Sequence, residues 1–141
     1  MKARLICTGI LAAMASFSAL AEGSLTAGCL NEMAYEPRLT ILADKVSIAQ
    51  SAARTARSAP ERVATAEERE AVALWGHLRQ QCFEFGAAQR RASMQAQEIA
   101  FLRSVFVFQQ RLVADLQAGR LTYAEFSKRR GELTEAAGQE I

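Results

Sequence analysis

The sequence contains few of the residues that build metal and catalytic centres. Its 141 residues include one histidine, three cysteines, one tryptophan and two prolines. A single histidine excludes a Cys₂His₂ zinc site. Because Cys7 lies in the apolar N-terminal run, the two remaining cysteines exclude a Cys₄ site. His77 and Cys82 are five positions apart on one helical run, so they lie on different faces and do not suggest a Cys–His catalytic pair.

Motifs for nucleotide and hydrolase chemistry are also missing. The sequence has no phosphate-binding loop, no G-x-S-x-G turn and no dinucleotide fingerprint. We therefore expect no catalytic residues, no metal site and no cofactor, and we interpret the chain as non-enzymatic.

Net charge is small as well. The sequence has 17 Lys and Arg against 15 Asp and Glu. Removal of the N-terminal segment that contains Lys2 and Arg4 leaves 15 positively charged and 15 negatively charged residues. A neutral chain lacks the clustered positive charge that binds a phosphate backbone, so we expect no nucleic-acid partner.

The N-terminus has the three parts of a secretory signal peptide. Lys2 and Arg4 precede an uncharged run over residues 5–21, which ends in the small-residue site Ala19-Leu20-Ala21. This pattern predicts a signal peptide over residues 1–21 that is cleaved after Ala21. Cleavage there leaves no membrane anchor and predicts a periplasmic or secreted protein.

The stretch before Cys29 offers a second processing site. Thr-Ala-Gly-Cys has the small residues that precede a lipidated cysteine, which would make the chain a lipoprotein. Thr26 stands where a leucine is usual, and this cut would lie eight residues beyond Leu20. We therefore favour cleavage after Ala21, which keeps Cys29 inside the mature chain.

Two cysteines, Cys29 and Cys82, lie outside the predicted signal peptide. In an oxidising compartment an even number of cysteines is interpreted as disulfide-bonded. Trp75, Leu78, Cys82 and Phe85 follow the three- and four-residue steps of a buried helical stripe. A buried cysteine in an exported chain needs a partner, and we predict the bond Cys29–Cys82.

Apolar periodicity predicts helices and no strand. We expect a signal peptide (1–21), a flexible lead-in (22–36) and a single helical domain over residues 37–141. The expected helices span about 37–57, 66–91, 93–117 and the segment after Thr122. A turn near 90–95 would separate the second from the third, although one long helix is the alternative. The fold class is all-α, a small bundle of three to four helices.

The sequence contains clear local signals for the ends of helices. Thr65 with Glu68, and Thr122 with Glu125, have the spacing of a capping box, in which the first side chain and the fourth residue's carboxylate satisfy each other's backbone amides. Gly119 fits the left-handed position that ends a helix. These signals place helix starts at about 66 and 123.

The third predicted helix is the most apolar and is our candidate for a contact surface. Phenylalanines recur along it at positions 101, 106 and 108. A helix that is apolar over a wide arc is either central in a bundle or covered by a partner. We name Phe101, Phe106 and Phe108 as possible partner contacts, with a homodimer or another protein as the partner.

The run Leu116 to Leu133, LQAGRLTYAEFSKRRGEL, resembles the short C-terminal domain known as SHOCT. The matching residues are Leu116, Gly119, Leu121, Thr122, Glu125, Phe126, Lys128 and Leu133, whereas Ala124 replaces a usual acidic residue. The resemblance implies a small helical hairpin of the kind found in assemblies, without catalytic residues. The remainder resembles small exported helical proteins of Gram-negative bacteria.

Two functional hypotheses follow from these observations. The first is an exported interaction or structural module that acts through its surface. The second is a chaperone-like protein that holds unfolded clients between amphipathic helices, which would require a concave apolar patch with a charged rim.

Overall fold

The computed structural model describes residues 24–49 and 59–139. Within these ranges the chain forms five α-helices and two 3₁₀ helices, with no strand, so the predicted all-α class is confirmed. The helices are α1 (Leu25–Glu32), α2 (Ala66–Phe85), α3 (Ala87–Ser93), α4 (Ala96–Gln117) and α5 (Tyr123–Gln139), and the 3₁₀ helices are η1 (Met33–Tyr35) and η2 (Pro37–Leu42). The signal peptide and its cleavage site lie outside the described residues.

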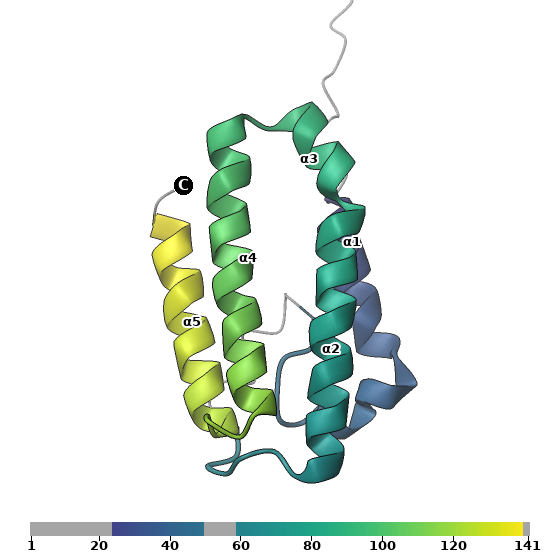
Figure 1. Ribbon diagram of the computed structural model, residues 1–141, viewed down its shortest axis with the longest axis vertical. Helices are drawn as coiled ribbons and strands as arrows, with labels where there is room; N and C mark the ends of the chain where they lie inside the picture. The colour runs from purple at the N-terminus through teal and green to yellow at the C-terminus, as the bar shows by residue number, and fades with distance from the viewer. Residues whose placement is uncertain (1–23, 50–58, 140–141) are drawn as a thin grey trace, which may run out of the picture.

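The three long helices α2, α4 and α5 form the bundle (Figure 1). α4 lies between α2 and α5 and packs against both, while α1 and η2 cover the other side of α2. The core is built on Trp75 of α2, which packs edge to face against Phe126 of α5 with 5.8 Å between the ring centroids. Other fully buried side chains include Leu39, Leu42, Val72, Leu116 and Tyr123.

The segment expected to be a flexible lead-in is structured from residue 24 onward. Ser24 caps α1 by accepting a hydrogen bond from the amide of Ala27. Leu30 and Met33 are then buried in the core. Small and polar residues dominate residues 22–30, so the composition gave no sign that Leu30, Met33 and the bonded Cys29 hold this segment against α2. The expectation of a flexible lead-in over 22–36 is therefore wrong for its described part.

The expected helix from Pro37 is shorter and tighter than the periodicity suggested. η2 ends at Leu42, and a turn follows in which the amides of Lys45 and Val46 both donate to the carbonyl of Leu42. Leu39, Leu42 and Val46 are nevertheless buried, as the apolar stripe predicted. A tight 3₁₀ turn followed by a bend presents residues three and four apart to the same side, so the stripe alone does not distinguish it from an α-helix. Residues 50–58 of the expected helix lie outside the described part.

The second predicted helix is divided at Gly86. α2 ends at Phe85 and α3 begins at Ala87, with Gly86 buried at the elbow. A Cβ atom at this position would lie 1.9 Å from the hydroxyl oxygen of Thr26 in α1. The close approach of α1 therefore requires glycine. Phe85, expected on the buried stripe, is instead exposed because the chain turns at the residue after it.

The predicted turn before the third helix and the predicted caps are confirmed. Met94 and Gln95 are extended between α3 and α4. Gly119 has a φ of 72°, and Thr122 and Glu125 exchange hydrogen bonds of 2.8 and 3.1 Å at the start of α5. The amides of Tyr123 and Ala124 donate to the carbonyls of Arg62 and Pro60. The connector before α2 is thereby fixed to the start of α5.

Candidate functional site

The predicted disulfide is present and joins α1 to α2. Cys29 and Cys82 are bonded, with 5.4 Å between their Cα atoms and a sequence separation of 53. The bond lies within the core contact between the two helices, where Cys82 is buried and Cys29 is partly exposed. A disulfide is compatible with an exported protein. Its position indicates a structural role for these cysteines.

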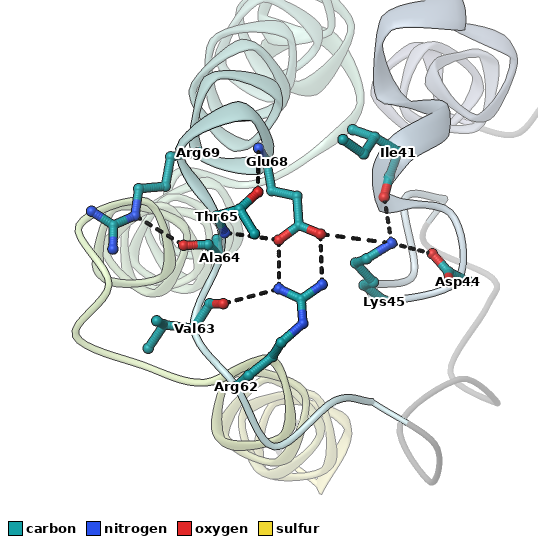
Figure 2. A network of polar contacts seen from close by, with 9 residues as sticks. All are labelled: Ile41, Asp44, Lys45, Arg62, Val63, Ala64, Thr65, Glu68 and Arg69. Atoms are coloured by element: carbon teal, nitrogen blue, oxygen red, sulfur yellow. Dashed lines mark hydrogen bonds and ion pairs between the residues drawn. The ribbon is translucent and has the colours of Figure 1, made fainter.

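A buried carboxylate lies where α2, the connector and the η2 turn meet (Figure 2). Glu68 accepts two hydrogen bonds of 2.7 Å from the Arg62 guanidinium and one of 2.8 Å from the amide of Thr65. Lys45 lies 3.8 Å from the same carboxylate. The hydrogen bonds from Arg62 lower the pKa of Glu68 to about 2, against the opposing effect of burial. These contacts join the η2 turn, the connector and α2, so the network is interpreted as a structural link between the three segments.

A groove runs along the side of the bundle where α2 and α3 face α4. Its volume is about 530 Å³. Phe83 and Phe106 stack across it with 4.1 Å between ring centroids and an interplanar angle of 9°. Val107, half exposed, extends this apolar floor. The groove mixes these apolar side chains with polar and charged ones, and its volume lies within the range found for ligand sites.

Arginines surround this floor. Arg90, Arg103 and Arg111 line the groove, whereas Glu84 is its one acidic lining residue. Among the described residues, neither Arg103 nor Arg111 forms an ion pair with a carboxylate. The groove therefore carries a surplus of positive charge on a chain whose expected mature form is neutral.

Arg90 is built into the wall of the groove. It is buried, and its guanidinium lies 3.9 Å from the centroid of the Phe83 ring. It donates to the hydroxyl of Thr26 at 2.6 Å and to the backbone carbonyl of Phe83. Burial lowers the pKa of Arg90, and the nearby positive charges of Arg103 and Arg91 lower it further. This end of the groove is thus fixed in place by α1 and is electropositive.

A second pair of arginines, Arg79 and Arg130, lies next to the buried ring of Trp75. Arg79 is buried and donates to the side-chain carbonyls of Gln109 and Gln110 of α4. The Arg79 guanidinium lies 5.5 Å from the centroid of the Trp75 ring. The guanidinium of Arg130, a residue of α5, lies at the same distance from that ring. Burial, together with Arg130, lowers the pKa of Arg79. The glutamine side chains thereby hold α4 at a fixed position against α2.

The three phenylalanines named from the sequence do not form one surface. Phe106 is buried in the groove floor, Phe108 is half exposed, and Phe101 is partly buried. On a helix with 3.6 residues per turn, Phe101 and Phe108 lie within about 20° of each other and about 140° or more from Phe106. Only Phe106 belongs to the groove. The sequence pattern missed the buried Arg79 and Arg90, because their burial depends on how α2, α3 and α4 pack.

The described residues were compared with the requirements of a metal site and of a membrane-spanning helix. Within residues 24–49 and 59–139, no cluster of three or more histidine, cysteine, aspartate or glutamate side chains is arranged to hold a metal ion. In the same ranges, none of the helices combines the length and apolar character needed to cross a bilayer. His77 is exposed.

Comparison with known proteins adds no relative. No family model, no curated protein and no solved structure matches the chain. The segment that resembles SHOCT forms the end of α4, a turn and the first part of α5. That resemblance stays a prediction.

Proposed function

We propose that the chain is an exported, non-enzymatic binding module that holds a protein partner in the groove between α2–α3 and α4. The single observation that carries the proposal is the groove itself, with its apolar floor at Phe83, Phe106 and Val107 and its arginine rim. Burial of exposed apolar surface supplies most of the driving force for protein association, and charges around the rim give specificity.

The framework around the groove supports this proposal. The disulfide fixes α1 to α2, Arg90 bonds to α1 at the elbow, and Arg79 links α2 to α4. A surface built on fixed elements binds without first losing the conformational entropy of its own walls. Because the disulfide forms in oxidising compartments, it also supports action outside the cytoplasm, in agreement with the predicted signal peptide.

Site-specific photo-crosslinking in the native host tests this function. A photoreactive amino acid at Val107 points the probe into the groove, and the same amino acid at Ala136, exposed on α5, is the matched control. We expect a discrete protein adduct from position 107 that is absent from position 136 and is lost when Arg103 and Arg111 are both changed to Glu. The absence of any adduct at 107, or equal adducts at both positions, would contradict the proposal.

A chaperone-like role is the second candidate, because the groove combines a concave apolar floor with a charged rim. Its limited size favours one short segment over many unfolded clients. Suppression of the aggregation of reduced, denatured insulin at equimolar protein would support the chaperone role. No suppression at tenfold excess would argue against it.

A further inference from the structure

The charge of the groove points to one kind of occupant. We propose that the groove binds an acidic amphipathic helix of another protein, with its apolar face on Phe106 and Val107 and its carboxylates on Arg103 and Arg111. This inference rests on the proposed binding function and adds the chemistry of the partner.

The surplus positive charge disfavours a second copy of this chain. A two-fold symmetric contact centred on the groove would bring Arg103 and Arg111 of one copy against the same residues of the other. Like charges facing each other across a desolvated interface are strongly unfavourable. A partner with carboxylates at matching positions instead gives each exposed arginine a counter-charge. The homodimer expected as one possibility from the sequence is therefore the less suitable occupant of this groove.

The spacing of the arginines matches a helical partner. Arg103 and Arg111 both line the groove on α4, and eight residues of helix separate them by about 12 Å. Phe106 and Val107 lie between them along the helix. Two glutamates seven residues apart on a docked helix are separated by about 10 Å, with leucines of the same face between them. Such a helix would place both carboxylates near arginines and its leucines on the apolar floor.

The walls favour a helix over an extended peptide. The groove is lined by side chains of α2, α3 and α4, whose backbone groups are engaged within their own helices. An extended peptide would find no strand edge there to pair with, whereas a helix satisfies its own backbone hydrogen bonds. The helix-in-groove mode of recognition thus fits the surface.

Small anionic molecules fit this arrangement less well. A fatty acid has one carboxylate, so it would neutralise one end of the groove and leave the other arginine without a counter-charge. The groove is also open along its length, which leaves much of an alkyl chain in water. The paired, separated charges therefore favour a partner with at least two carboxylates.

A charge-exchange experiment with three defined peptides tests the inference. Each is a capped, fluorescein-labelled 18-residue helical peptide with the same leucines, and with Glu, Gln or Lys at two positions seven residues apart. Binding to the disulfide-bonded protein is measured by fluorescence anisotropy. We expect the affinity to fall in the order Glu, Gln, Lys, with at least a tenfold difference between the Glu and Lys peptides, and to decrease for the Glu peptide as salt rises.

The variant R103E/R111E should reverse this order, so that the Lys peptide binds best. The matched control, K128E/R129E, makes the same change of net charge at exposed positions of α5 and should keep the original order. Circular dichroism verifies that both variants remain folded. Equal affinities for the three peptides, or the same reversal in the control, would overturn the inference.

Three further outcomes distinguish a failure of this inference from a failure of the proposed function. If the Glu peptide fails to bind while the crosslink at position 107 still forms, the partner is not an acidic helix, although the groove remains a binding surface. If submicellar oleate competes fully with the Glu peptide and binds more tightly, the groove is a fatty-acid site and the inference is wrong. If neither crosslink nor peptide binding occurs, both proposals fail.

Discussion

The carboxylate of Glu68 accepts two hydrogen bonds of 2.7 Å from the guanidinium of Arg62 (Figure 2). Six residues separate the two, and the pair closes the connector over the start of α2. The same connector supplies the carbonyls that accept from the first amides of α5. The Arg62–Glu68 pair therefore holds the connector against the start of α2, and the connector in turn is hydrogen-bonded to the start of α5.

This relationship predicts an acid-sensitive fold. The Arg62 hydrogen bonds lower the pKa of Glu68 from its ordinary 4.5 to about 2 in the folded state. A carboxyl group with a depressed folded-state pKa contributes stability that is fully present above its unfolded value and is lost as pH falls through the folded one. We expect the free energy of unfolding, measured by urea titration, to fall between pH 5 and about pH 2.

Glu68→Gln should remove part of this acid sensitivity. The variant retains the side-chain shape but loses the charge-assisted hydrogen bonds, which should cost about 1–3 kcal/mol at pH 7. Its stability should then depend less on pH over the acidic range than that of the parent. Equal pH dependence in the two proteins would show that the network contributes little.

The disulfide should contribute strongly to stability. Cys29 and Cys82 close a loop of 53 residues, and the chain-entropy model assigns such a loop about 4 kcal/mol. We expect C29S/C82S to unfold at a lower urea concentration, with α1 losing protection from hydrogen exchange first. Unchanged stability after reduction would contradict this role.

Two glycines should respond to alanine in opposite directions. At Gly86 an added Cβ would clash with the side chains of Thr26 and Arg90. Gly131 lies at an exposed position of α5, where nothing lies within 4 Å of an added Cβ. Gly131→Ala should therefore stabilise the protein by up to about 1 kcal/mol through helix propensity. Gly86→Ala should destabilise it and weaken peptide binding, because the elbow that holds Arg90 must shift. Thermal unfolding of both variants checks the signs.

The mass of the exported chain tests its processing. Cleavage after Ala21 and formation of the disulfide predict the mass of residues 22–141 less two hydrogens, with no lipid. A mass that begins at Cys29 with attached acyl chains would instead identify a lipoprotein. Electrospray mass spectrometry of the intact protein distinguishes the two.

Local chemistry made the starts of α2 and α5, the end of α4 and the disulfide predictable from the sequence. A capping box such as Thr65 with Glu68 depends on neighbouring residues alone, and so does the left-handed position of Gly119. The cysteine pairing followed because the predicted signal cleavage would leave two cysteines. These features require no knowledge of how distant segments pack.

The groove could not be predicted in the same way. The elbow at Gly86 arises because α1 approaches the backbone there, and α1 itself lies in a segment whose small residues suggested flexibility. Arg90 and Arg79 are buried because aromatic rings and glutamines from other helices surround them. Hydrophobic periodicity counts arginine as a polar, exposed residue, so it gave no sign of these buried arginines. It also led us to name Phe101, Phe106 and Phe108 as contacts, although these side chains face different directions on α4.

Mapping the binding surface by NMR shows directly whether an acidic helix occupies the groove. The Glu peptide is added to the ¹⁵N-labelled, disulfide-bonded protein, and changes in amide chemical shift are followed residue by residue. We expect the shifts to concentrate in residues 80–90 and 103–114, with α5 beyond Lys128 unaffected. Shifts that concentrate on α5, or that spread evenly over the molecule, would contradict this expectation.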